Sequence, residues 1–185
     1  SNAWMLGEMF QGCGNLETLD LSKWDVSNVV TFQQMFQWCG NLVTIDCSNW
    51  NTKNAAVFCQ MFCDCTKLEN IIGIENFVTT AADITINAKD PETGEDMGAP
   101  LVWHFYQMFM GCKSLEELNL SSFNTRKASD FTEMFANCEK LKTIYVGDGW
   151  GLDNAGTTRV DKSGITGTDN KGKELSVAVN LFTGC

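Results

Sequence analysis

A pair of apolar residues, usually methionine followed by phenylalanine, recurs along the chain at regular intervals. The pairs are Met9-Phe10, Met35-Phe36, Met61-Phe62, Met108-Phe109, Met134-Phe135 and a weaker copy, Leu181-Phe182. The steps between successive pairs are 26, 26, 47, 26 and 47 residues. A fixed period of this length is typical of repeat proteins, in which each unit packs against its neighbours in the sequence.

Other positions keep step with this pair. A cysteine lies four residues after the first member of each pair, at Cys13, Cys39, Cys65, Cys112, Cys138 and Cys185. An L-x-x-L-x-L pattern begins three residues after the cysteine, as in residues 16–21, and predicts a short strand. Apolar residues at helical spacing lead into each pair, as in residues 29–39, and predict a short helix.

These columns predict an α/β fold: a leucine-rich-repeat-like solenoid of about five and a half units of 26 residues, each a short strand, a turn and a short helix. Since neither element can bury its apolar side alone, the units must stack with their leucines and cysteines inward. We expect residues 4–185 to form this single domain. Residues 1–3, Ser1-Asn2-Ala3, are interpreted as a remnant of tag cleavage.

The two steps of 47 residues place insertions near 79–99 and 152–172, between the strand of one unit and the next Met-Phe pair. Each insertion has extended residues on both sides of a turn-rich stretch, which predicts a β-hairpin. A degenerate extra unit is the alternative, but neither insertion contains a Met-Phe pair with its cysteine. We expect the two hairpins to emerge on one edge of the solenoid, about 10 Å apart.

Composition excludes some classes of partner. The formal net charge of -10 repels a phosphate backbone, so nucleic acid is not an expected partner. No run of eighteen apolar residues is present, and we expect no membrane insertion of this segment.

The nine cysteines suggest a disulfide framework or a metal site until their spacing is considered. Six form the repeat column, so they are interpreted as small buried residues with unpaired thiols. Cys59, Cys63 and Cys65 place three sulfurs close together but lack a second ligand pair and a nearby histidine. The acidic stretches 90–96 and 148–169 lack the spacing of a calcium loop. We therefore predict no metal site and no cofactor.

His104 is the sole histidine, so any mechanism that needs an imidazole base depends on it. It stands at the start of a predicted helix, where a surface or partly packed position is expected. Residue spacing assembles no nucleophile, base and orienting group elsewhere, and the chain is not predicted to be an enzyme.

The outward side of the strands carries the candidate binding residues, because strand alternation turns residues between the core leucines toward solvent. They form two columns: Thr18, Thr44, Asn70, Glu117 and Thr143, and beside them Asp20, Asp46, Asn119 and Tyr145. Trp38 is a further candidate, because its column otherwise holds small or polar residues and an exposed aromatic favours contacts. Simple solvation of a sheet is the alternative for the two columns.

Units of the form M-F-x-x-C-x-x-L-x-x-L-x-L-S-x-W/F-D/N resemble the BspA-like leucine-rich-repeat surface proteins, including the branch first described as a mycoplasma domain of unknown function. The resemblance covers most of the chain and fails in the two insertions. It implies a bacterial protein that is extracellular or attached to the cell surface, in a family linked to adhesion and protein binding, without catalytic residues. We therefore expect a recognition module for a protein or glycan on a host or neighbouring cell. The alternative is a passive spacer within a larger surface protein.

Overall fold

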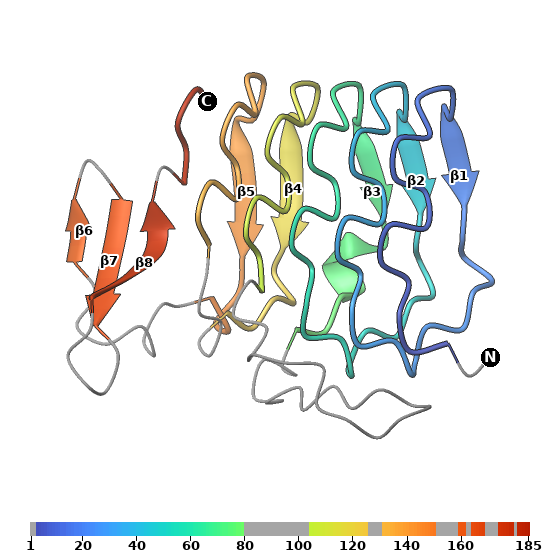
Figure 1. The fold of residues 1–185 in the computed structure, drawn as a ribbon, viewed down its shortest axis with the longest axis horizontal. Coiled ribbons are helices and arrows are strands. Elements are labelled where there is room, and N and C mark those ends of the chain that lie inside the picture. Colours follow the sequence, from blue (N-terminus) through green and yellow to red (C-terminus); the bar gives the residue numbers. More distant parts are fainter. Residues whose placement is uncertain are drawn as a thin grey trace.

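Short strands lie in chain order along the array (Figure 1). The computed structural model describes residues 3–79, 104–125, 131–150, 159–161, 164–168, 174–179 and 181–185. The strands are β1 (Thr18–Asp20), β2 (Thr44–Asp46), β3 (Asn70–Ile72), β4 (Glu117–Leu120) and β5 (Thr143–Val146). β1, β2 and β3 form one parallel sheet, and β4 and β5 form a second.

The register of these sheets reproduces the sequence period. Thr18 pairs with Thr44 and Thr44 pairs with Asn70, so each residue lies beside the one 26 positions later. Glu117 pairs with Thr143 in the same way. The central residues, such as Ile45 and Ile71, are buried, while their neighbours along the strand are partly or fully exposed. The strands therefore form where the sequence predicts them, because alternation buries one side chain in two.

The segment around each Met-Phe pair is a series of turns instead of a helix. Its backbone N–H groups alternate between two kinds of partner. The Phe36 N–H donates to the Met61 carbonyl of the next unit at 2.9 Å, while the Gln37 N–H donates to the Gln34 carbonyl three residues earlier at 3.2 Å. An α-helix needs consecutive bonds to the carbonyl four residues earlier. Because alternate N–H groups are committed to the neighbouring unit, these segments cannot be helical.

Backbone angles lead to the same conclusion. Two residues in each of five units adopt a left-handed conformation, with φ between 51° and 73°. They are Glu8 and Gly12, Gln34 and Trp38, Gln60 and Asp64, Gln107 and Gly111, and Glu133 and Asn137. Two left-handed residues within five positions reverse the chain repeatedly and end any right-handed helical run.

The predicted α/β leucine-rich-repeat-like solenoid of strand, turn and helix is therefore wrong. Among the described residues no α-helix is present, and the one helical element is a three-residue 3-10 helix, η1 (Ile74–Asn76). The misleading signal was the three-residue spacing of apolar positions. That spacing fits a helix, but it also fits successive turns closed by an N–H bond to the carbonyl three residues earlier.

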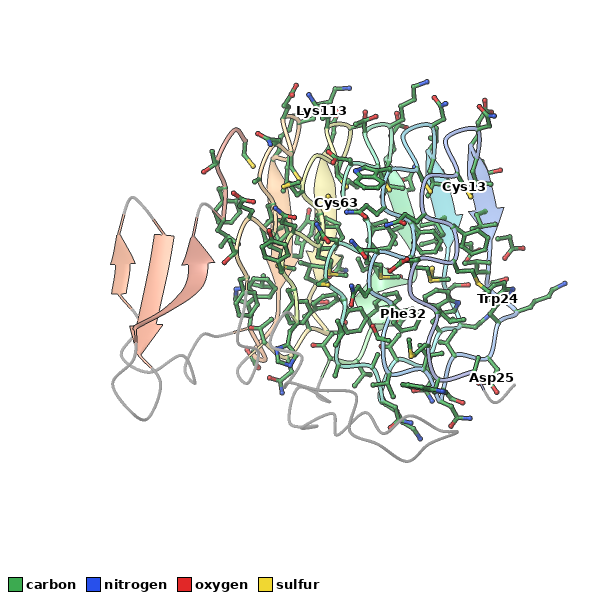
Figure 2. The ribbon with its side chains drawn as sticks, in the orientation of Figure 1. Cys13, Trp24, Asp25, Phe32, Cys63 and Lys113 are labelled. Carbon is green, nitrogen blue, oxygen red and sulfur yellow. The ribbon has the colours of Figure 1, made fainter. Side chains whose placement is uncertain are left out.

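Columns of aromatic rings form the core between the strands and the Met-Phe segments (Figure 2). The phenylalanines of the six Met-Phe pairs stack along the whole array, with ring centroids 5.4–5.7 Å apart. A parallel column, Phe32, Phe58, Phe105 and Phe131, has centroids 5.4–5.9 Å apart. All four rings of this second column are buried. The core therefore repeats along the stack as the sequence does.

The two insertions have different outcomes. Residues 80–103, which include nearly all of the first predicted hairpin, lie outside the described residues. In the second, β6 (Arg159–Asp161), β7 (Gly164–Thr168) and β8 (Glu174–Val179) form a three-stranded antiparallel sheet in the order β6-β7-β8. The two outer strands arise where extended residues were predicted, but they do not form one hairpin, because β7 lies between them and pairs with both.

Candidate binding surface

The first predicted column lies along the solvent side of the two parallel sheets. Thr18, Asn70 and Glu117 are exposed, and Thr44 and Thr143 are partly exposed. Side chains of this column make no hydrogen bond to another residue within the described part of the chain. Their hydroxyl, amide and carboxylate groups therefore face solvent with free bonding capacity.

The second predicted column has a structural role as well. Asp20, Asp46 and Asn119 each stand at or near a strand end, and each side-chain oxygen accepts the backbone N–H of the serine two residues later, at 2.9–3.1 Å. Such bonds close a turn within the chain. At Asp20 the bonds from Ser22 hold the pKa of the carboxyl below its usual value. Tyr145, half exposed, completes this column, and Ile72 occupies its position in β3.

The two sheets part between β3 and β4, although the Met-Phe segments of the same two units remain bonded. The Phe62 N–H donates to the Met108 carbonyl at 2.9 Å, but β3 and β4 belong to separate sheets. β3 is followed by Gly73, which has φ of 91° and leads into η1. A side chain at Gly73 would overlap the backbone of Ser48, so this path requires glycine.

A polar hollow of about 380 Å³ lies at this break. Its lining comes from both sides of the break: Glu69, Asn70, Ser114, Glu116, Glu117 and Lys140. Two of these, Asn70 and Glu117, belong to the predicted first column. Lys142 lies next to the hollow, and its ammonium group contacts the Glu116 carboxylate at 2.7 Å. That contact lowers the pKa of Glu116.

Sequence reasoning missed Glu69, Ser114, Glu116 and Lys140. The sequence predicts one evenly spaced sheet, which gives no reason to single out the residues between β3 and β4. A usable signal was present, because the first step of 47 residues separates the units of β3 and β4. A long insertion marks the junction at which neighbouring strands are most free to separate.

Trp38 is exposed, as its column predicted, with 56% of its surface accessible. Its backbone is left-handed, with φ of 63°, and its N–H donates to the Cys63 carbonyl at 2.9 Å. It lies in the turn segment of its unit, away from the strands, and so it does not join the two strand columns in one site.

An apolar hollow of about 370 Å³ lies at the N-terminal end of the stack, near Trp24 and Asp25, which Figure 2 labels. It is lined by Ala3, Leu6, Met9, Trp24 and Asp25. Met9 is 53% exposed, whereas the equivalent Met35 and Met61 are fully buried by neighbours on both sides. The hollow is thus the uncovered end of the repeating core.

The cysteine column forms a ladder of thiol hydrogen bonds. Five of its six thiols donate to the phenylalanine carbonyl of the preceding Met-Phe pair: Cys39 to Phe10, Cys65 to Phe36, Cys112 to Phe62, Cys138 to Phe109 and Cys185 to Phe135, at 2.9–3.1 Å. All nine cysteines are free, and the four inner members of the column are buried as predicted. The prediction of burial is wrong for Cys13 and Cys185, because the end units have a neighbour on one side.

Burial makes the inner thiols poor nucleophiles. It raises the pKa of Cys39 to about 11 and that of Cys138 to about 12, and it raises the pKa values of Cys65 and Cys112 well above the ordinary value. A thiolate is the reactive form of cysteine, and these thiols remain protonated at neutral pH. Over the described ranges no group of three or more His, Cys, Asp and Glu side chains is placed to hold a metal ion.

His104 is buried, which corrects the prediction of a surface or partly packed residue at a helix start. No helix begins there, and the His104 carbonyl accepts the Phe58 N–H at 2.8 Å as part of the ladder between units. Burial lowers the pKa of its imidazole. The side chain belongs to the interior of the stack.

Comparison with known proteins gives a family and no nearer relative. The model of one family matches residues 1–89 and 98–159, and that family is described as "Mycoplasma protein of unknown function, DUF285". No curated protein and no solved structure matches the chain. Among the described residues, no helix is long and apolar enough to cross a membrane.

Proposed function

This chain belongs to the family of mycoplasma proteins of unknown function whose model spans most of it, and we propose that it is a non-catalytic recognition module at a bacterial cell surface. The proposed ligand is an extended polymer, either protein or glycan. Surface location and adhesion follow from the resemblance to BspA-like surface proteins and form part of the proposal.

The first column of the strand face carries this proposal. Five polar side chains, one from each parallel strand, point outward, in register within each of the two sheets, and have no hydrogen bond to the described protein. Neighbouring paired strands are about 4.8 Å apart, so the column presents a row of donors and acceptors along the array. A row suits an extended chain better than a small metabolite, which needs a deep pocket.

An array of glycans and extracellular proteins tests the proposal. The Asn70→Arg variant places a long charged side chain in the middle of the column, and we expect it to abolish binding of the ligand that the array identifies. Asn28→Arg is the matched control, because Asn28 is also exposed but lies in a turn after β1. Normal binding by Asn70→Arg would exclude the strand face as the site. Absence of any ligand would favour the passive spacer.

A further inference from the structure

The break between β3 and β4 exposes two strand edges that face one hollow. Elsewhere in each sheet, backbone groups at a strand edge pair with the next unit, as in the Lys142 N–H to Glu116 carbonyl bond of 2.9 Å. No such pairing joins β3 to β4 within the described residues. Unpaired edges of this kind accept an additional extended chain through main-chain hydrogen bonds.

Carboxylates surround the same hollow. Glu69, Glu116 and Glu117 line it, and Lys140 is the one basic residue among the residues that form its wall. Glu116 is already engaged by Lys142, whereas Glu69 and Glu117 have no ion pair to another described residue. With Lys140 in the wall and Lys142 beside it, the three carboxylates still leave the hollow net negative, so it is complementary to a positively charged partner.

We propose that this hollow binds an extended polypeptide segment rich in lysine or arginine. Its backbone pairs with the edge of β3 or β4, and its basic side chains contact Glu69 and Glu117. A glycan lacks the alternating N–H and C=O groups that a strand edge recognises, and a sulfated or phosphorylated polymer is repelled by the carboxylates. The inference rests on the proposed function and specifies its ligand.

The test uses a ten-residue peptide of alternating lysine and threonine, with binding measured by isothermal titration calorimetry. Glu69→Gln with Glu117→Gln removes the two unpaired carboxylates and keeps the side-chain shape. We expect the Kd of this double variant to rise at least about tenfold. Glu8→Gln with Glu75→Gln is the matched control, because both glutamates are exposed, lie outside the hollow and remove the same charge. Its Kd should change less than about twofold.

A second arm tests the strand pairing. N-methyl groups on alternate residues remove the backbone N–H donors from one edge of the same peptide. When that edge of the peptide faces the protein, we expect binding to be about tenfold weaker. Both methylation registers are measured. If the two methylated peptides bind with the same Kd as the parent peptide, the peptide does not pair with a strand edge. If the control variant Glu8→Gln with Glu75→Gln raises the Kd as much as Glu69→Gln with Glu117→Gln does, the interaction is only general charge attraction.

The failure of this inference is distinguishable from failure of the proposed function. If the basic peptide does not bind, but Asn70→Arg abolishes binding of a different ligand from the array, the choice of a basic polypeptide is wrong and the strand face remains the site. If neither the peptide nor any arrayed ligand binds, both proposals fail.

Discussion

The strand side and the Met-Phe side of the same units differ in continuity. On the Met-Phe side, ring stacking and thiol bonds run without interruption from Phe10 to Phe182. On the strand side, pairing stops between β3 and β4. The Met-Phe side holds the stack together through columns that each repeat supplies, whereas strand pairing is interrupted at this one junction. Stability is thereby assigned to one side of the array and the proposed recognition to the other.

The largest expected effect on the Met-Phe side is alkaline unfolding. Six buried thiols have raised pKa values in the folded protein, among them Cys39 at about 11 and Cys63 and Cys138 at about 12. The unfolded chain releases these protons near pH 9 and the folded chain does not. Stability is therefore fully present below pH 9 and falls above it, by about 1.4 kcal/mol per thiol for each pH unit, until the folded pKa is reached.

Urea unfolding between pH 8 and pH 10 measures this slope. Cys138→Ala should reduce the slope by the contribution of one buried thiol. A wild-type free energy of unfolding that stays constant from pH 8 to pH 10 would contradict the buried thiol ladder.

Truncation of one stacked ring is the next largest effect. Phe62 is fully buried, with Phe36 at 5.4 Å on one side and Phe109 at 5.7 Å on the other. Phe62→Ala should lower the free energy of unfolding by about 3–5 kcal/mol, because it leaves a cavity and removes two ring contacts. Thr44→Ala on the strand side should change it by less than about 0.5 kcal/mol. Similar losses in the two variants would erase the proposed division between the sides.

A ladder of amide side chains on the Met-Phe side has a direction, and reversing it sharpens the comparison. Gln34 donates to Gln60, Gln60 to Gln107, and Gln107 to Glu133, at 2.6–2.9 Å. An ionised glutamate only accepts, so Glu133 fixes the direction of every donor. In the Gln60→Glu variant, Gln107 lies between two carboxylates, so its side-chain oxygen must face one of them whichever way the amide is turned. The variant should lower the free energy of unfolding by about 1–2 kcal/mol.

The double variant Gln60→Glu with Glu133→Gln removes this conflict, because Gln107 can now donate to residue 60 and accept from residue 133. We expect it to regain most of the lost stability in urea unfolding at pH 7, while Glu133→Gln alone is nearly neutral. Additive losses in this cycle would show that the ladder has no fixed direction.

The smallest effect separates the two columns of the strand face. Asp46 accepts the Ser48 N–H at 2.9 Å, whereas Thr44, two residues earlier on β2, has no such bond. Asp46→Ala should therefore lower the free energy of unfolding by about 1 kcal/mol, whereas Thr44→Ala should leave it nearly unchanged, as measured by urea unfolding. If the two variants are equally stable, the Asp46–Ser48 bond contributes nothing measurable to stability, and the predicted structural role of the second column is wrong. With the expected result, binding studies should use the first column and avoid the second.

The period, the strands and the inward columns follow from the residue pattern alone. Leucine, phenylalanine and cysteine at fixed positions leave one way to bury the apolar side chains, namely to stack each unit on the next, and the observed register of 26 residues follows. The exposed first column and exposed Trp38 also follow from local alternation and from the column pattern.

Contacts between units select among the conformations that local spacing leaves open. A three-residue apolar spacing fits both a helix and a series of turns, and it is the bonding of alternate N–H groups to the next unit that selects turns. The 47-residue step marks the junction between β3 and β4, but whether the strands pair there depends on where the preceding unit lies and on the path after Gly73. Residues that line the hollow, such as Glu69 and Lys140, become neighbours through that stacking, since they are distant in the sequence.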